Sequence, residues 1–185
     1  MGYFNPKPEK NILTDIILKW LTDILVILAL AGFIIFFLGE KVSVVGNSMA
    51  GKIQNGQEIL IDKISYELRQ VRRFDVIVYN SELSGEKEQV VRRVIGLPGE
   101  TVQIVDSTIY INGEELKDTY YKGSFESGYA SSEIKVGKNE YFVLGDNRNL
   151  SQDSRFEYVG NINRKDIIGK AWLIISPFNQ IKLIR

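Results

Sequence analysis

The longest apolar run in the sequence spans residues 20–38 and reads WLTDILVILALAGFIIFFL, with Thr22 and Asp23 as its only clearly polar members. A helix needs about 20 consecutive apolar residues to cross the hydrocarbon core of a bilayer. The run also lacks the polar face that a surface helix of a soluble protein shows. It therefore predicts a transmembrane anchor over residues 20–39, with a buried helix of a soluble protein as the alternative.

The segment before this run, residues 1–19, is mixed in polarity and carries lysines. Basic residues beside a membrane helix favour the cytoplasmic side, so we expect a cytoplasmic tail and an extracytoplasmic domain over residues 40–185. Residues 29–31 (Ala-Leu-Ala) fit the cleavage pattern of a removed signal peptide. They lie inside the apolar run, however, which favours an uncut anchor in the cell membrane that crosses it once.

Beyond the anchor, short apolar runs alternate with Gly, Asn and Pro turn signals. Residues 64–71 are the one candidate for a short helix. We therefore expect a mainly β protein, an N-terminal transmembrane helix followed by an antiparallel β domain. The polar, tyrosine-dotted stretch 106–138 reads as an inserted variable subdomain of strands and loops. The runs predicted as strands are 42–45, 59–61, 74–79, 89–95, 101–105, 108–111, 140–144, 171–175 and 181–184.

Composition narrows the possible chemistry. Basic and acidic residues both number 23, so there is no basic excess to attract nucleic acid. The 185 residues include no cysteine and no histidine. Disulfides, thiolate nucleophiles, Ser-His-Asp triads and zinc sites built on imidazole or thiolate are therefore excluded. We expect no metal and no cofactor.

Ser48 is the candidate nucleophile, because it follows a strand-like run and stands between Gly46 and Gly51. Glycines let the backbone approach a ligand closely. A serine in such a loop can attack a carbonyl while backbone N–H groups stabilise the oxyanion. A plain polar turn is the alternative. Without histidine, the base would be a lysine, a carboxylate or the N-terminus, and a buried lysine with a lowered pKa is the known solution.

Two further motifs follow Ser48. The first is Arg-Arg-Val-Ile-Gly-Leu-Pro-Gly-Glu at residues 92–100, and the second is Gly-Asp-Asn-Arg-Asn-Leu-Ser-Gln-Asp-Ser-Arg at residues 145–155. Together with the anchor and the Ser-Met pair at residues 48–49, and in this order, they resemble the type I signal peptidases of bacteria. The resemblance runs from about residue 20 to the C-terminal strands and leaves the middle insertion unmatched.

The resemblance implies a membrane-bound serine endopeptidase that cuts signal peptides from exported preproteins after small-x-small sequences. It also implies an antiparallel β domain interrupted by a second, variable one. Ser48 matches the nucleophile, and Ser151 matches a serine that hydrogen-bonds the catalytic lysine. Gly46 and Met49 fall in the oxyanion and substrate region, where the Ser48 N–H would be a donor. Structural positions at the site are Asp146, Asn147, Arg148, Asp153, Ser154 and Arg155, with Asp153 and Arg155 as an ion pair.

One departure from the family affects the chemistry directly: Arg92 occupies the position of the general-base lysine. Shifting a lysine pKa into the working range takes about 3–4 kcal/mol, whereas an arginine needs about 8 kcal/mol. Arg92 should stay protonated, so it can donate to an oxyanion but cannot accept the Ser48 proton. Lys52, four residues after Ser48, is an alternative base. Gly51-Lys52 also replaces a usual Pro-Thr, and Phe74 replaces a usual glycine.

Two hypotheses remain from the sequence. In the first, the protein is a signal peptidase that still cleaves, weakly or with an altered base. In the second, it is a noncatalytic member that acts as an accessory or chaperone-like protein in pilus assembly, as degenerate relatives in Gram-positive bacteria do. Its partners would be signal peptides of preproteins or pilin subunits, and the membrane bilayer. A membrane-anchored β adaptor with chance motif matches is a third, unrelated class.

Overall fold

The computed structural model of the chain describes residues 12–82, 85 and 87–184, and the side chains of residues 34–38 are outside this description. The chain divides into two units, residues 1–39 and residues 40–185, which are treated separately below. Most of the predicted cytoplasmic tail, residues 1–11, lies outside the described residues.

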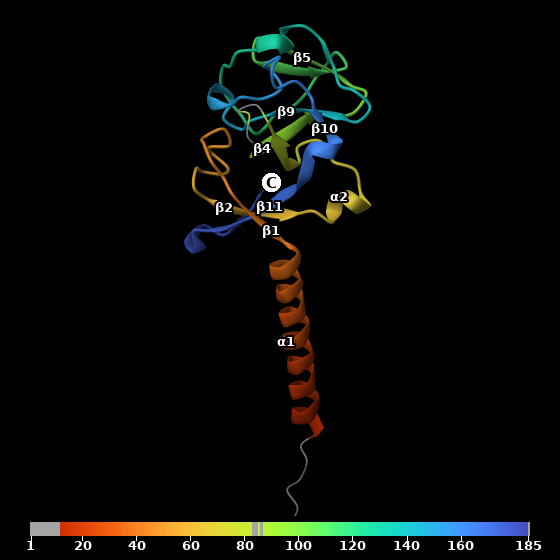
Figure 1. Cartoon of the computed structure of the whole chain (residues 1–185). Coiled ribbons are helices and arrows are strands. Elements are labelled where there is room, and N and C mark those ends of the chain that lie inside the picture. The colour runs from red at the N-terminus through yellow and green to blue at the C-terminus, as the bar shows by residue number, and fades with distance from the viewer. Residues whose placement is uncertain (1–11, 83–84, 86, 185) are drawn as a thin grey trace, which may run out of the picture. The chain divides into compact units, whose positions relative to one another are not determined.

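In the described part of the first unit there is one long helix, α1 (Ile12–Leu38), shown in Figure 1. Its segment Ile12–Phe33 is long and apolar enough to cross a membrane. The Thr22 hydroxyl donates to the Leu18 carbonyl at 2.8 Å, which satisfies that polar group within the helix. The expected apolar helix is confirmed, but it covers eight residues before the predicted span because Ile12, Leu13, Ile16 and Ile17 extend the apolar surface past Lys19.

The second unit is built on an eight-stranded antiparallel sheet. Its strand order is β1-β2-β11-β3-β4-β9-β10, with β12 paired to β11. The central strands β3 and β4 pair over six residues, which sets Arg92 opposite Ile77. The strands are β1 (Glu40–Ser43), β2 (Glu58–Asp62), β3 (Val76–Ser81), β4 (Glu88–Gly96), β9 (Glu140–Leu144), β10 (Ile162–Asn163), β11 (Ile167–Ser176) and β12 (Lys182–Leu183).

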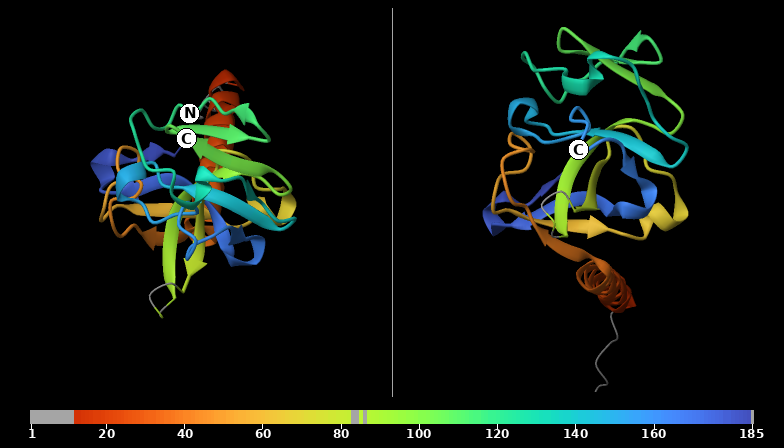
Figure 2. Two further views of the ribbon diagram at one scale, coloured as in Figure 1. Left: turned by 90° about the horizontal axis from the view of Figure 1, so that it is seen from above. Right: turned by 45° about the horizontal axis from the view of Figure 1, so that its top comes forward.

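A second, four-stranded sheet has the strand order β7-β6-β5-β8. It lies beyond β4 and β9, on the side away from β1 (Figures 1 and 2). It begins at Thr101, five residues before the predicted start of the insertion. The reason is a tight β5–β6 hairpin, in which Asp106 and Ser107 adopt φ values of +47° and +65°. Its strands are β5 (Thr101–Val105), β6 (Thr108–Ile111), β7 (Glu114–Glu115) and β8 (Ile134–Lys135).

Helical turns in the second unit are short, as expected. The predicted helix at residues 64–71 is the single turn α2 (Ser65–Leu68). Four 3-10 turns occur in the connections: η1 (Gly128–Ser131), η2 (Arg148–Leu150), η3 (Arg164–Asp166) and η4 (Phe178–Gln180). Together with the two sheets, they confirm the predicted mainly antiparallel β fold with one N-terminal apolar helix.

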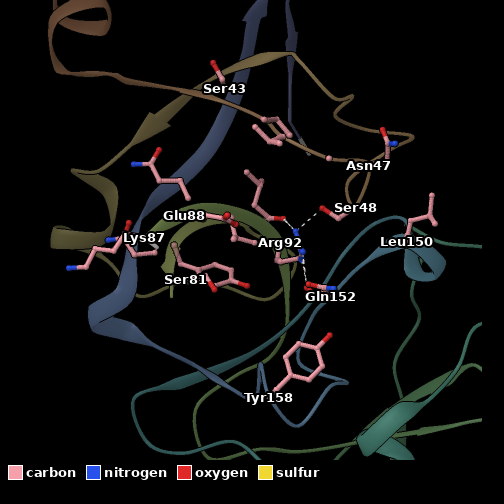
Figure 3. A pocket seen from close by; sticks show the side chains of 18 residues that line it. Ser43, Asn47, Ser48, Ser81, Lys87, Glu88, Arg92, Leu150, Gln152 and Tyr158 are labelled. Carbon is pink, nitrogen blue, oxygen red and sulfur yellow. Dashed lines mark hydrogen bonds between the residues drawn. The ribbon is translucent and has the colours of Figure 1, made fainter. Parts of the chain in front are cut away.

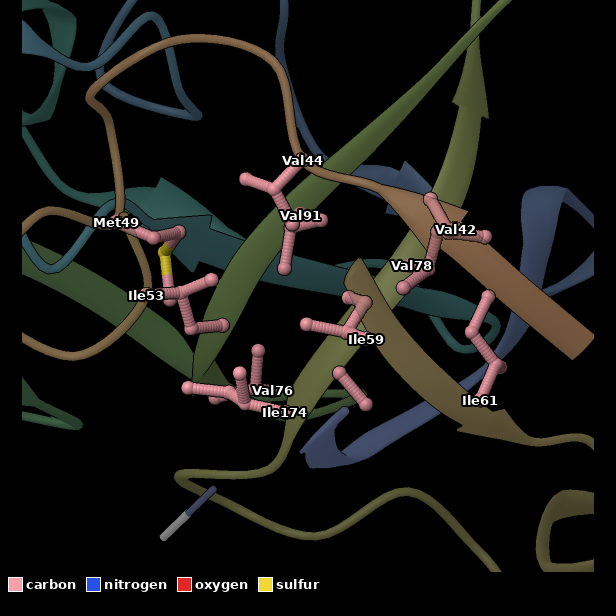
Figure 4. Close-up of a cluster of buried hydrophobic side chains, with 11 residues drawn as sticks. Val42, Val44, Met49, Ile53, Ile59, Ile61, Val76, Val78, Val91 and Ile174 are labelled. Atoms are coloured by element: carbon pink, nitrogen blue, oxygen red, sulfur yellow. The ribbon is translucent and has the colours of Figure 1, made fainter. Parts of the chain in front are cut away.

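Two features of the core bear on the cleft. In the first, Val42, Val44, Val91 and Met49 pack together (Figure 4), which fastens the segment after β1 to β4.

The second feature is Gly96 at the end of β4, where the two sheets meet. A Cβ atom there would lie 2.6 Å from Val102 Cγ2 and 2.9 Å from Phe142 Cβ. Only glycine fits at this contact, so the two sheets pack in one arrangement.

Candidate active site

A cleft of about 1110 Å³ opens in the second unit (Figure 3). One wall is the end of β1 and the segment that follows it, residues 43–48, and the opposite wall comes from β3 and β4. Leu150, Gln152 and Tyr158 contribute from the loop after β9. Ser48 and Arg92 therefore face the same space, although 44 residues separate them in the sequence.

The Ser48 turn is held in place by backbone contacts on both sides. Gly46 has a φ of +90°, a conformation that favours glycine, and its N–H donates to Asn55 Oδ1 at 2.9 Å. The Ser48 carbonyl accepts the Asn147 N–H at 2.9 Å. Gly145 allows this approach, because a Cβ atom there would lie 2.6 Å from the Ser48 carbonyl oxygen. The Ser48 side chain is thus fixed, half-buried, at the cleft.

The Met49 side chain holds the Ser48 turn against the core. It is fully buried in the core cluster, and its Sδ accepts the Asp146 N–H at 3.4 Å. It does not line the cleft. The structure therefore gives the Met49 side chain a supporting role beneath the loop that carries Ser48, and its predicted place in the substrate region stays a prediction.

Arg92 reaches Ser48 from β4. Its Nη1 donates to Ser48 Oγ at 2.7 Å and to the Val91 carbonyl at 2.7 Å. Its Nε and Nη2 donate to the Gln152 carbonyl at 3.0 and 2.7 Å. The side chain is almost fully buried, and Figure 3 shows it between Ser48 and Gln152. The sequence-predicted nucleophile and the residue at the base position are therefore in direct contact.

The charge of Arg92 decides what this contact can do. Burial lowers the pKa of the guanidinium below its ordinary value, while Tyr79 and Asp153 act in the opposite direction. Arginine starts so high that burial still leaves it protonated near neutral pH. The guanidinium donates to Ser48 Oγ and has no lone pair to accept a proton. Within the described chain, no other hydrogen bond joins the Ser48 hydroxyl to a side chain that could act as base.

Ser151, the predicted base-orienting residue, is buried, but its Oγ has no hydrogen-bond partner in the described part of the chain. A buried hydroxyl without a partner is unusual, because it has lost its water without gaining a protein partner. The guanidinium of Arg92 instead turns to the Gln152 carbonyl. The predicted role of Ser151 in orienting a base therefore stays a prediction, since no hydrogen bond joins it to Arg92 among the described residues.

The remaining motif residues build a buried ionic framework. Arg155 Nε donates to Asp153 Oδ1 at 2.8 Å, and Asp153 Oδ2 accepts the Gly145 N–H at 3.0 Å. Asn147 Nδ2 donates to the Asn47 carbonyl at 3.1 Å, and Ser154 Oγ accepts the Val143 N–H at 3.0 Å. The other ion pairs of the framework are Arg93 with Asp146 and Arg148 with Asp118.

Lys52 is engaged away from the serine. Its ammonium lies 5.9 Å from the centroid of the Tyr120 ring, which belongs to the inserted stretch. No hydrogen bond between Lys52 and Ser48 occurs among the described residues. The alternative base suggested by the four-residue spacing therefore gains no support from the geometry.

Sequence reasoning missed several contributors to the site. Gln152 acts through its backbone carbonyl, so no side-chain pattern could have indicated it. Tyr79 lines the cleft from β3, whereas the sequence pattern indicates only that it belongs to a strand. Asp118 and Tyr120 come from the insertion, where Tyr120 lies 3.6 Å from the Arg93 guanidinium carbon. Their partners are 30 and 27 residues away, so only the fold brings them together.

Fold and site together define a β protein with an apolar N-terminal helix and a serine-centred cleft of the peptidase type. Comparison with known sequences gives the family: the one described as signal peptidase, peptidase S26, matches residues 17–176. The chain therefore belongs to this family.

Similar proteins carry the same family name. Signal peptidase I P of Bacillus subtilis subsp. natto is 33% identical over 174 residues, covering 90% of this chain and 92% of that protein. Signal peptidase I T of Bacillus subtilis (strain 168) is 35% identical over 177 residues, covering 91% and 90%. A solved signal peptidase I from Enterococcus faecalis V583 is 33% identical with a TM-score of 0.44, covering 55% of this chain and 97% of that chain.

Proposed function

We propose that this protein binds the signal-peptide region of exported preproteins in the Ser48 cleft and cleaves it weakly or not at all. α1 anchors it in the cell membrane, with the N-terminus in the cytoplasm and the β domain outside. The family supports signal peptides as ligands. The observation that carries the loss of catalysis is the 2.7 Å contact in which Arg92 donates to Ser48 Oγ.

The physical argument concerns one proton. For Ser48 to attack a carbonyl, its hydroxyl proton must move to a base in hydrogen-bond reach. The group in reach is a guanidinium, and making it neutral costs about 8 kcal/mol at the pH where a lysine base works. The other features of a peptidase cleft are kept, so recognition can survive where proton transfer does not.

The retained residues also support a second reading, that of a slow enzyme. Ser48 is half-buried at the cleft, and the buried Asp153–Arg155 pair stands behind it. A peptidase working through water or an unusual base would need the same framework. The role in pilus assembly, with pilin subunits as partners, stays a prediction that rests on the resemblance alone.

One experiment tests the proposal with the full chain in detergent. The ligand is a preprotein with an Ala-x-Ala signal peptide, and the control is the same mature protein without it. We expect binding that requires the signal peptide, by fluorescence anisotropy, and an unchanged intact mass of the preprotein after prolonged incubation. Equal binding of the mature protein, or complete cleavage of the preprotein during the incubation that disappears in Ser48→Ala, would refute it.

A further inference from the structure

Four arginines are almost fully buried among the described residues, and one of them differs from the rest. Three form ion pairs with aspartates. Arg92 has no ion pair with a carboxylate in the described chain, and its acceptors are the Val91 and Gln152 carbonyls and the Ser48 hydroxyl. The paired arginines are Arg93 with Asp146, Arg148 with Asp118, and Arg155 with Asp153.

A buried guanidinium without a counter-charge is costly, because carbonyl dipoles replace only part of its lost hydration. Arg92 is not sealed in the interior, however, since it lines the cleft beside Ser48 (Figure 3). Its four hydrogen bonds leave one of its five N–H groups, on Nη2, without an acceptor. The Ser48 N–H likewise has no protein acceptor among the described residues. The positive charge of Arg92 and the Ser48 hydroxyl therefore lie in contact at the cleft.

We propose that Arg92 and Ser48 form a receptor for the terminal carboxylate of a peptide whose chain lies in the cleft. A guanidinium binds a carboxylate with charge-assisted hydrogen bonds, and the carboxylate supplies the direct ion pair that Arg92 lacks among the described residues. The cleft of about 1110 Å³ is far larger than a small anion needs. Its walls are β3 and β4 on one side and, on the other, the end of β1 with the irregular segment that follows it, from Ser43 to Ser48. The cleft suits a peptide that ends at Ser48.

This inference rests on the proposed function only in taking signal-peptide segments as occupants. An internal peptide bond carries no charge, whereas a chain end carries a carboxylate. The cleft would therefore favour a signal peptide that has already been cut over the uncut preprotein. That preference separates a receptor for released ends from an enzyme that must bind the intact bond.

The test compares two peptides on the full-length protein in detergent. Both are labelled at the N-terminus and end in the same Ala-x-Ala sequence, one as the free carboxylate and the other as the carboxamide. We expect the carboxylate to bind roughly tenfold more tightly or better by anisotropy titration. The comparison uses the native chain, so no variant has to fold for it to be decisive.

Two variants locate the effect. Arg92→Gln should abolish the preference for the carboxylate, provided that circular dichroism shows a folded protein. Lys87→Gln removes the same charge from the exposed part of the same cleft and should keep most of the preference. A preference that survives Arg92→Gln would overturn the assignment to Arg92.

The remaining outcomes are also decisive. Equal binding of both peptides would overturn the carboxylate receptor and leave the proposed function standing. No binding of either peptide would overturn both. Displacement of the peptide by acetate at equal concentration would show a small-anion site and overturn the peptide proposal.

Discussion

At the scale of single residues, the site is decided by which nitrogen faces Ser48. An ammonium on a flexible stem can lose its proton when buried, and it then has a lone pair for the serine proton. The Arg92 guanidinium keeps its protons, and its planar fork spans from Ser48 to the Gln152 carbonyl. Its acceptors are two backbone carbonyls and the Ser48 hydroxyl, and Ser151 Oγ has no partner among the described residues.

Ser151 and Ser154 give a matched pair of predictions. Both are buried in the same loop, but Ser154 Oγ accepts the Val143 N–H at 3.0 Å, whereas Ser151 Oγ has no partner among the described residues. Ser151→Ala should leave the free energy of unfolding unchanged or raise it by up to about 1 kcal/mol, because it removes an unpaired hydroxyl. Ser154→Ala should lower it by about 1–3 kcal/mol.

Denaturant unfolding of both variants in detergent measures these changes. The contradictory result is a Ser151→Ala loss as large as that of Ser154→Ala. It would mean that Ser151 holds a hydrogen bond in solution, for example through a bound water.

At the scale of elements, the corner before β3 shows how divergence has been accommodated. Phe74 has a φ of +70°, in the left-handed region that favours glycine. The strand expected from residue 74 therefore starts at Val76. The corner persists because the Phe74 ring lies 5.2 Å from Tyr120 and its carbonyl accepts Arg93 Nη1 at 2.8 Å.

Phe74→Gly and Phe74→Ala separate strain from packing. Both remove the ring and its contacts, but only glycine relieves the left-handed backbone. We expect both to be destabilised, with the glycine variant more stable than the alanine variant by about 1 kcal/mol, the reverse of the usual order. Urea unfolding of the two proteins measures the difference. A more stable alanine variant would show that the corner relaxes out of the left-handed region.

The strands themselves could be predicted from sequence because alternation and turn residues are local signals. The predictions for residues 101–105, 108–111 and 140–144 coincide with β5, β6 and β9. The short strands β7, β8 and β10 were not predicted, because a strand of two residues is too short to show an alternating pattern. The change in composition at residue 106 falls at the turn between β5 and β6, so it does not mark Thr101, where the second sheet begins.

At the scale of the whole molecule, the sequence could predict which residues lie at the site. It could not predict which hydrogen bonds they form. The motifs located Ser48, Arg92 and Ser151, because chemistry restricts which side chains appear there. Two features of the bonding depend on how far side chains extend between β4 and the loop after β9. They are the hydrogen bond from Arg92 to Ser48 and the lack of a partner for Ser151 Oγ among the described residues. Local sequence does not encode such distances.

Stability of the whole β domain should depend on alkaline pH through Tyr79. Burial raises the pKa of this hydroxyl from 10.0 to about 12, with Arg92 opposing the rise and Asp153 adding to it. The unfolded state then loses its proton first, so stability is full below pH 10 and falls as pH rises through about 12. The slope is about 1.4 kcal/mol per pH unit.

Urea unfolding at pH 9, 10.5 and 11.5 measures that dependence. Tyr79→Phe should flatten the fall over this range, while Tyr66 and Tyr141, whose pKa values burial also raises, keep part of it. Equal slopes in the native protein and Tyr79→Phe would contradict the assignment.

The central claim is that the peptidase framework is intact and lacks only a base for Ser48. Its most direct test is the single-turnover cleavage rate of an Ala-x-Ala preprotein by the native chain, Arg92→Lys, and Arg92→Lys combined with Ser48→Ala. General-base catalysis contributes on the order of 10²–10⁴-fold. We expect a gain of that size in Arg92→Lys, and we expect the gain to disappear in the double variant. Ser48-dependent cleavage by the native chain at the rate of Arg92→Lys would contradict the claim.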